Sequence, residues 1–331
     1  MTGPNGDGAG RAHLRVAVIG VGHLGRFHAI KYAAHPGAEL VAVVDTDAAR
    51  AAEIGRELGV PYFTEHQAVL GRIDCASVAV PTCDHHVVAR DLLREGVDVL
   101  VEKPITTTVA DGKDLLEFAV RGGRVLQVGH LERFNPAVRA LQGRLGSPRF
   151  VECQRLAPFT DRGTDVDVVL DLMIHDLDLL LSMVPSPVRS VEAVGVPVLT
   201  ESVDIANARL RFANGCIANL TASRVSLKRE RKLRMFQGDA YFSIDFDEHK
   251  VRTCRRELGP DGQMALVLED LEVDSRDALE IEIDAFLNAV RQRETPPVTG
   301  WDGLRALELA HVIRESVEME VRAAQAVALA E

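Results

Sequence analysis

The chain has 331 residues, 47% hydrophobic and 26% charged, which is typical of globular proteins and excludes a disordered or fibrous chain. At roughly 100 to 200 residues per domain, this length favours two domains. Lys and Arg number 38 against 49 Asp and Glu, and the net charge of −11 argues against a large surface for nucleic-acid backbones. A local cluster of arginines could still bind one small anionic ligand.

The N-terminus and the cysteines favour a cytoplasmic protein. Residues 1–13 are polar and rich in glycine, lack the apolar stretch of a signal peptide, and are expected to form a flexible tail. The five cysteines are widely spaced and include no C-x-x-C pair, which favours a reducing compartment and no zinc site. The most apolar segment, 166–184, contains four aspartates and a histidine, so it is not expected to span a membrane.

From Leu14 onward, apolar runs rich in β-branched residues alternate with helical stretches. Continuous apolar strands between helices indicate parallel strands that are buried on both faces. Residues 14–130 are therefore predicted to form a Rossmann domain, a doubly wound parallel sheet that binds a dinucleotide. The six predicted strands are 14–20, 39–45, 60–63, 73–80, 97–101 and 124–128.

Residues 131–331 are predicted to form a second, α+β domain for substrate binding and oligomerisation. A helix is predicted over 136–145, with Asn135 as its N-cap and a proline at its first position. Strand-like segments follow further along, with a hairpin turn at Asn214-Gly215, and they indicate an open, mainly antiparallel sheet. Two helices are predicted beyond residue 277, and these could also pack on the first domain.

A glycine-rich turn follows the first predicted strand and opens the first predicted helix. Gly20, Gly22 and Gly25 have the G-x-G-x-x-G spacing that brings a pyrophosphate to a helix N-terminus. Asp45 ends the second predicted strand, where its carboxylate can accept ribose hydroxyls and would repel a 2′-phosphate. The pattern predicts NAD; the alternative is a tight turn and a helix cap with no cofactor role.

Further polar residues follow the fourth and fifth predicted strands, at the sheet edge where doubly wound folds bind ligands. Lys103, in the sequence Glu102-Lys103-Pro104, could hold a reacting oxygen and stabilise negative charge. The alternative is a solvated lysine in a turn that Pro104 fixes. The candidate cofactor residues are Gly20, Gly22, His23, Leu24, Gly25, Asp45, Thr82, His85, Glu102 and Lys103.

Asp167, Asp171, His175 and Asp178 have the spacing that predicts one polar stripe along a mostly apolar helix. A buried polar stripe is costly unless it faces partners or a cavity. A histidine with a carboxylate four residues before it suits general-base chemistry. A core histidine with satisfied hydrogen bonds and a metal site both remain as alternatives at this point.

The chain resembles, in five motifs, the oxidoreductase family of glucose–fructose oxidoreductase, inositol dehydrogenase and rhizopine catabolism proteins (Gfo/Idh/MocA). The motifs are GVGHLGRFHA, VAVPTCDHH, VEKPIT, GHLERFNPA and DLMIHDLD, in that order, and the resemblance covers the chain from Leu14 onward. It implies a Rossmann domain, a second domain whose open sheet usually forms subunit contacts, and nicotinamide chemistry generally without a metal. It also implies a catalytic set of Lys103, Asp171 and His175.

The segments GHLERFNPAV and RLAPFTDRGTDVDVVLDLMIHDLDLLLSMV are similar to one branch of that family. This branch oxidises the C3 hydroxyl of UDP-N-acetylglucosamine so that a partner aminotransferase can install a 3-amino group for lipid A. The resemblance implies that His175 takes the hydroxyl proton, Asp171 orients His175 and Lys103 positions the oxygen. The alternatives are a dehydrogenase for inositol, a free sugar or a UDP-N-acetyl-uronate, and a non-catalytic, nucleotide-sensing regulator.

The expected substrate-binding residues include three arginines for the diphosphate, since guanidinium groups bind phosphate oxygens bidentately. The full set is Lys103, Arg133, Asn135, Arg155, Arg162, Asp171 and His175. The alternative for each arginine is a solvent-facing side chain. The basic run from Lys228 to Lys232 is interpreted as a solvated strand end and is not included. A homo-oligomer, dimer or tetramer, is expected, with no nucleic-acid partner.

Overall fold

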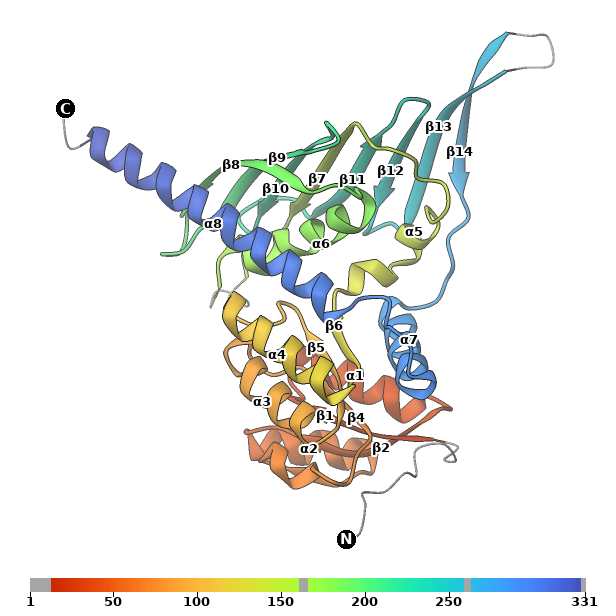
Figure 1. The fold of residues 1–331 in the computed structure, drawn as a ribbon, viewed down its shortest axis with the longest axis vertical. Helices are drawn as coiled ribbons and strands as arrows, with labels where there is room; N and C mark the ends of the chain where they lie inside the picture. Colours follow the sequence, from red (N-terminus) through yellow and green to blue (C-terminus); the bar gives the residue numbers. More distant parts are fainter. Residues whose placement is uncertain (1–12, 161–165, 259–262, 329–331) are drawn as a thin grey trace. The chain divides into compact units, whose positions relative to one another are not determined.

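A computed structural model describes residues 13–160, 166–258 and 263–328 (Figure 1). The chain divides into two compact units. Unit 1 comprises residues up to Gly129 together with Leu279–Trp301, and unit 2 comprises His130–Ala278 and the residues from Asp302 onward. The tail expected over residues 1–13 lies outside the described residues except for His13.

Unit 1 is built on a sheet of six parallel strands in the order β3-β2-β1-β4-β5-β6. The strands are β1 (Leu14–Ile19), β2 (Ala38–Val44), β3 (Tyr62–Phe63), β4 (Cys75–Val78), β5 (Asp98–Glu102) and β6 (Leu126–Gly129). The doubly wound sheet is confirmed, and each predicted strand overlaps an observed one. The strand order reverses between β1 and β4, so the carboxyl ends of these strands form the edge at which such sheets bind ligands.

The helices of unit 1 begin and end where their sequences favour it. The connecting helices are α1 (His23–Ala34), α2 (Ala48–Leu58), η1 (His66–Val69), α3 (Thr82–Arg94) and α4 (Val109–Gly122). The side chains of Asp47 and Thr108 cap α2 and α4, and Gly59 and Gly123 end them in the left-handed conformation. A helix from near the C-terminus, α7 (Ala278–Gln292), also contributes to this unit, and Phe286 packs in its core.

Unit 2 contains an eight-stranded sheet in the order β14-β13-β12-β11-β7-β10-β9-β8. The strands are β7 (Phe150–Leu156), β8 (Val188–Val196), β9 (Ile205–Phe212), β10 (Ile217–Ser223), β11 (Glu230–Phe236), β12 (Ala240–Asp245), β13 (Lys250–Leu258) and β14 (Met264–Leu271). All neighbours pair antiparallel except β7 and β10, which are parallel. This confirms the mainly antiparallel sheet. The strands β7, β13 and β14 were not predicted.

The helical segments of unit 2 include one clear correction. They are η2 (Leu131–Phe134), α5 (Pro136–Arg139), a π-helical turn over Val169–Met173, α6 (Ile174–Met183) and most of α8 (Gly300–Ala328). Asn135 does cap α5, accepting a hydrogen bond from the Ala137 amide at 3.0 Å. The helix ends at Arg139, so the predicted extent to 145 is wrong. Turns follow, and Gly143 has a φ of +75°, which an α-helix cannot include.

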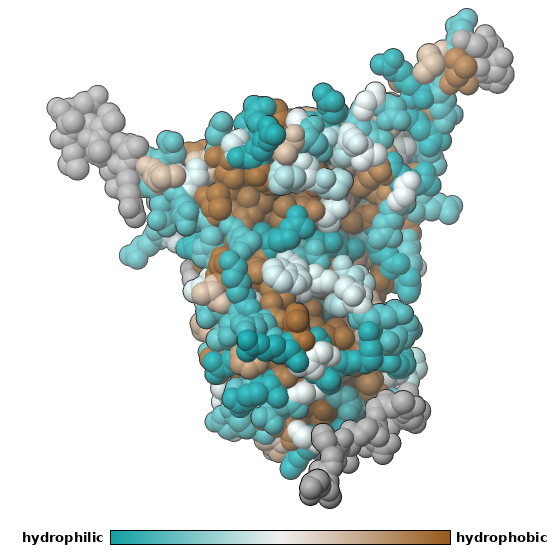
Figure 2. Space-filling view, viewed as in Figure 1, coloured by the Kyte–Doolittle hydropathy of each residue, from teal (hydrophilic) through white to brown (hydrophobic). Residues whose placement is uncertain are grey.

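The helices α6 and α8 lie against the sheet of unit 2 (Figure 1). The Ala193 amide of β8 donates to Ser316 Oγ of α8 at 3.2 Å, so α8 is tied to the edge strand. A hollow of about 440 Å³ between α6, the start of β8 and α8 is lined by Leu181, Val188 and Leu309, among others. Figure 2 shows apolar residues gathered over this part. In the described ranges, no helix has the length and apolar character needed to cross a membrane.

Candidate active site

The turn between β1 and α1 contains three glycines that serve different purposes. Gly20 has a φ of +83°, and a Cβ there would lie 2.6 Å from the Ala79 carbonyl oxygen. A Cβ on Gly25 would lie 1.7 Å from the Gly20 oxygen, so the chain itself requires both glycines. A Cβ on Gly22 would come no nearer to the chain than 3.6 Å, from Arg50 Nη1. Gly22 therefore keeps open the approach to the N-terminus of α1, as a bound pyrophosphate needs.

Asp45 lies beside this turn, at the end of β2. Its Oδ2 accepts a hydrogen bond from the Val21 amide at 2.9 Å, and its Oδ1 accepts one from the Asp47 amide at 2.9 Å. Each carboxylate oxygen has a further lone pair for a hydroxyl donor. The carboxylate is therefore held in place and can still accept hydrogen bonds from a ribose. The glycine turn and Asp45 together fit a nicotinamide dinucleotide, with His23 and Leu24 exposed in the first turn of α1.

His85, expected to contact the cofactor, is instead a buried structural residue. Its Nδ1 lies 2.9 Å from the Pro104 carbonyl oxygen and its Nε2 lies 3.0 Å from the Val80 carbonyl oxygen. Burial lowers the pKa of His85, although both carbonyl contacts oppose that shift. His85 thus joins the start of α3 to the loop after β5, and the expected cofactor contact does not agree with this arrangement. Thr82 is the first residue of α3 and is half-buried.

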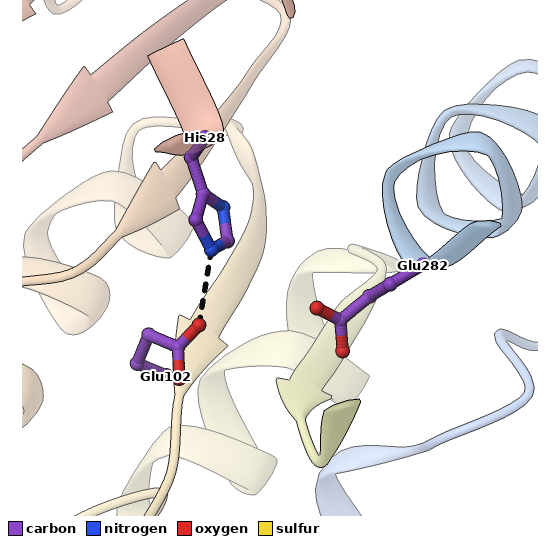
Figure 3. Close-up of side chains that lie close together, drawn as sticks. All are labelled: His28, Glu102 and Glu282. Carbon is purple, nitrogen blue, oxygen red and sulfur yellow. Dashed lines mark hydrogen bonds and ion pairs between the residues drawn. The ribbon is translucent and has the colours of Figure 1, made fainter. Parts of the chain in front are cut away.

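Glu102, at the end of β5, belongs to a buried polar cluster (Figure 3). Its Oε1 lies 3.0 Å from His28 Nε2, and His28 Nδ1 lies 3.1 Å from Ser77 Oγ. The Tyr32 hydroxyl continues the chain of contacts, 2.9 Å from the same Ser77 oxygen. Glu282 of α7 supplies a second carboxylate. A ring nitrogen of His28 and one carboxylate oxygen from each of Glu102 and Glu282 lie within 4.8 Å of one another.

The two carboxyl groups of this cluster have opposite pKa shifts. Burial and the nearby Glu102 raise the pKa of Glu282 well above its usual value, and no described residue hydrogen-bonds either of its carboxyl oxygens. Burial also opposes ionisation of Glu102, but the hydrogen bond to His28 and the charge of Lys103 outweigh it, so the pKa of Glu102 is lowered. A neutral Glu282 therefore lies near an ionised Glu102, and Glu102 accepts a hydrogen bond from the Lys103 amide at 3.3 Å.

Sequence reasoning placed Glu102 at this edge of the sheet but missed His28 and Glu282. Both lie one helical turn from an aromatic core residue, Tyr32 in α1 and Phe286 in α7. A polar side chain on the apolar face of a helix was the available signal, because such a residue has to find a partner inside the fold.

The chain around Asp171 and His175 differs from the predicted single helix. Asp167 Oδ1 accepts hydrogen bonds from the amides of Val169 and Leu170 at 3.0 and 3.1 Å, and so begins the helical segment. The wider π-helical turn over 169–173 precedes α6. The predicted single α-helix over this stretch is therefore interrupted by a π turn, which rotates the residues that follow it. Asp171 lies in the π turn and His175 at the start of α6, and both are half-buried.

The arginines expected to bind a diphosphate form ion pairs within unit 2. Arg133 Nε and Nη2 donate to the two carboxylate oxygens of the buried Asp178 at 2.7 and 2.8 Å. Asp302 lies 3.6 Å from Arg133 Nη2. Asn135, besides capping α5, donates from Nδ2 to Glu132 at 3.0 Å. Arg133 and Asn135 therefore hold η2 and α5 in place, and their expected role in binding substrate stays a prediction.

Arg155 of β7 is more fully committed, with only 2% of its surface exposed. Its Nε and Nη2 donate to Asp176 at 3.1 and 2.9 Å, and its Nη1 donates to Glu132 at 2.8 Å. Burial opposes the charge, but the two carboxylates outweigh it and raise the pKa of Arg155. Arg155 thus supports α6 on the sheet, contrary to the expected diphosphate contact. Arg162 lies outside the described residues.

Two protein-family models match the chain. The one described as an oxidoreductase family with an NAD-binding Rossmann fold matches residues 14–130. The one described as the GFO/IDH/MocA C-terminal domain matches residues 137–244. The two matches correspond to the parallel sheet of unit 1 and to most of the strands of the second sheet.

Individual relatives extend over most of the chain. The UDP-N-acetylglucosamine 3-dehydrogenase of Acidithiobacillus ferrooxidans is 41% identical over 308 residues, 92% of this chain and 98% of that protein. A solved structure of that enzyme has a TM-score of 0.87, covering 93% of this chain and 98% of that one. The scyllo-inositol 2-dehydrogenase (NAD(+)) of Bacillus subtilis is 28% identical over 89% of this chain and 92% of that protein. Levoglucosan dehydrogenase in complex with NADH, at 17% identity, has the same fold, with a TM-score of 0.83 over 93% and 98% of the two chains.

Proposed function

Because the chain belongs to the Gfo/Idh/MocA oxidoreductase family, we propose that it oxidises the C3 hydroxyl of UDP-N-acetylglucosamine, with NAD as the hydride acceptor. The observation that carries this proposal is the 41% identity, over 92% of the chain, to a dehydrogenase named for that substrate. The open position at Gly22 and the fixed carboxylate of Asp45 support the choice of cofactor.

Three residues perform the chemistry in this proposal. NAD supplies the hydride acceptor when bound. His175 takes the proton from the C3 hydroxyl, so that a hydride and a proton together leave the CH–OH group and a ketone remains. Asp171 orients the His175 ring and stabilises its charged form. Lys103 positions the oxygen and stabilises its negative charge during the reaction, and Glu102 next to it holds the loop in place.

Substitution of His175 and Lys103 tests these roles. His175→Ala and Lys103→Ala should each lower turnover by about 10²- to 10⁴-fold, the usual contribution of a positioned proton acceptor or charge. Their affinity for NADH should stay within about twofold of the wild type, because neither residue contributes to the glycine turn or to Asp45. His249→Asn and Lys113→Ala replace exposed residues and serve as matched controls. Full activity in both catalytic-site variants would rule out this mechanism.

The substrate itself is tested by product analysis. Purified protein is incubated with NAD and UDP-N-acetylglucosamine, and an aminotransferase with an amino donor removes the ketone. A 3-amino sugar identified by mass is the expected product. A preference for inositol, a free sugar or a UDP-N-acetyl-uronate in the same assay would identify the alternative dehydrogenases. No NADH formation with any of these compounds would favour a nucleotide-sensing regulator.

The proposal includes a homo-oligomer and a cytoplasmic location. Val194 and Val196 of β8, and Met264, Leu266 and Leu268 of β14, are large apolar residues that are about half or more exposed. Such residues on one face of a sheet suit contact with a second copy of the chain. All five cysteines are free, as is usual in a reducing compartment. Light scattering of the purified protein would detect a dimer or tetramer, and a monomer would contradict the oligomer.

A further inference from the structure

Arg231, on β11, faces the helix-covered side of the second sheet. It pairs in register with Arg155 of β7, so the two arginines are direct cross-strand neighbours on the same face. Leu233 and Met235 share that face, and both are completely buried. The side chain of Arg231 is 32% exposed, at the end of the strand where this buried face reaches solvent. Arg231 is thus at a strand end, as the basic run indicated, but it is partly buried rather than fully solvated.

The guanidinium group of Arg231 has no close carboxylate partner. The nearest ion pair joins Arg231 Nε to Asp247 Oδ1 at 4.0 Å, beyond hydrogen-bond distance. That Asp247 oxygen already accepts a hydrogen bond from Arg229 Nε at 3.1 Å. Across the described ranges, no residue makes a hydrogen bond to the Arg231 side chain. Arg231 therefore has unused donors, whereas all three guanidinium nitrogens of Arg155 donate to carboxylates.

The surroundings of Arg231 disfavour its charge. Burial, and then repulsion by Arg155 and Arg229, lower its pKa, and the attraction of Glu132 and Asp247 does not compensate. A cation in such a position reduces stability unless something else offsets the cost. A bound anion would provide both the missing charge and the missing acceptors.

Arg231 lies close to the turn that carries the proposed catalytic residues of unit 2. Arg155 connects the two, because its guanidinium group binds Asp176, which directly follows His175 in α6. The cross-strand neighbour of Arg155 is Arg231. A sugar with a phosphate substituent carries both an anion of the kind that Arg231 is suited to bind and a hydroxyl of the kind proposed to react at His175.

We propose that Arg231 forms an anion subsite that binds the diphosphate oxygens of a nucleotide sugar. The inference rests on the proposed function for the sugar, but the subsite itself rests on the unpartnered guanidinium group. Arginine suits this role because its planar donors fit two phosphate oxygens at once. Arg155, one of the arginines expected to bind the diphosphate, is buried and has all three guanidinium nitrogens engaged within unit 2.

The test compares Arg231→Met with Arg229→Met, which removes the same charge two residues away, just before β11 begins. The protein is saturated with NADH, so that the cofactor site does not compete for phosphates. Calorimetry then measures the affinity for UDP, inorganic pyrophosphate and UDP-N-acetylglucosamine. Arg231→Met should weaken all three by about 10- to 100-fold, as expected for loss of a charged hydrogen-bonding group, and Arg229→Met should weaken them by no more than about threefold.

The melting temperature separates a binding role from a structural one. Arg231→Met removes a charge that its surroundings disfavour, so the protein should melt at the same temperature as the wild type or higher. A lower melting temperature together with weaker binding would mean that Arg231 supports the fold, and would overturn the proposal. An equal loss of affinity in Arg229→Met would mean a diffuse basic surface, which also overturns it.

The outcomes distinguish this subsite from the proposed function. If the wild type oxidises UDP-N-acetylglucosamine and Arg231→Met binds it normally, the subsite is wrong and the function stands. If pyrophosphate binds through Arg231 but no nucleotide sugar is oxidised, the subsite stands and the function is wrong. If the wild type binds neither UDP nor pyrophosphate, the subsite is wrong.

Discussion

Glu102 and Glu282 show how two identical side chains acquire different charges within one cluster. Glu102 has His28 as a hydrogen-bond partner and Lys103 as a nearby cation, whereas burial dominates at Glu282. A proton on Glu282 avoids two adjacent negative charges in a region that water does not reach. The cluster therefore provides one negative charge beside Lys103, where a second would compete for the same cation.

The proton on Glu282 should make stability depend on pH. The folded state retains this proton above the usual carboxyl pKa, and the unfolded state releases it, so stability falls as the pH rises from about 4.5 toward the raised pKa of Glu282. Glu282→Gln keeps a neutral group of the same shape and removes this dependence. Urea unfolding at pH 5, 6 and 7 measures the free energy of unfolding. The value for the variant, relative to that for the wild type, should increase by up to about 1.4 kcal/mol per pH unit.

Glu280→Gln is the matched control, because Glu280 lies on the same helix, is half-exposed and pairs with Lys31. That variant should follow the wild-type dependence on pH. Parallel curves for the wild type and Glu282→Gln would mean that Glu282 is ionised in the folded protein.

At the level of single residues, local geometry can be predicted where a local motif fixes it, and the cofactor contacts of those residues stay a prediction. The glycine spacing and Asp45 are examples, since a turn, a strand end and a helix start fix their geometry. The sequence did not indicate the ion pairs of Arg133 and Arg155, whose partners lie 45 and 21 residues away. No local pattern separates an arginine with a distant buried carboxylate from one that awaits a ligand.

At the level of elements, the β1–α1 turn separates the needs of the fold from those of the cofactor. A Cβ at position 25 would overlap the Gly20 backbone, so Gly25→Ala should unfold unit 1 or prevent soluble expression. A Cβ at position 22 meets nothing closer than 3.6 Å, so Gly22→Ala should cost less than about 1 kcal/mol of stability. Gly22→Ala should still weaken NADH binding at least tenfold, because the methyl group occupies the approach of the pyrophosphate.

Thermal unfolding and NADH fluorescence titration measure the two effects separately. Gly238→Ala controls for the substitution itself, because no described atom lies within 4 Å of a Cβ added at that position. Normal NADH affinity in a folded Gly22→Ala protein would contradict the assignment of the pyrophosphate to this turn.

The elements that sequence reasoning missed depend on long-range pairing. The strand β7 carries Arg155 on its buried face. This charged residue interrupts the alternation of apolar and polar residues that predicts a strand. The contacts of Arg155 with Asp176 and Glu132 make this strand compatible with a buried sheet. The predicted helix over 136–145 was too long. Its composition favours a helix, but Gly143 takes a left-handed turn conformation.

At the level of the whole molecule, unit 1 is completed by a segment that comes much later in the chain, Leu279–Trp301. The helix α7 supplies five residues to the core of unit 1. These are Ile283, Phe286, Leu287, Ala289 and Val290. Unit 1 is therefore not a contiguous domain of about 130 residues, and NAD binding should depend on a segment that begins near residue 279.

Phe286→Ala tests this dependence. The side chain is completely buried, so its removal should cost about 3 to 5 kcal/mol of stability and lower the temperature at which NADH binding is lost. Val120→Ala, which truncates a residue that is 70% exposed on α4, should have little effect on either quantity. If NADH binding in Phe286→Ala persists to the wild-type temperature, α7 is dispensable for unit 1.

The position of α7 also affects how the protein is made. When Gly129 has been synthesised, the segment that completes its unit lies roughly 150 residues further along the chain. At about 5 to 20 residues per second, a ribosome needs on the order of 10 to 30 s to deliver it. During that time the nascent sheet exposes the apolar surface that Phe286 and Leu287 later cover. Unit 1 can therefore mature only after the segment Leu279–Trp301 has been synthesised.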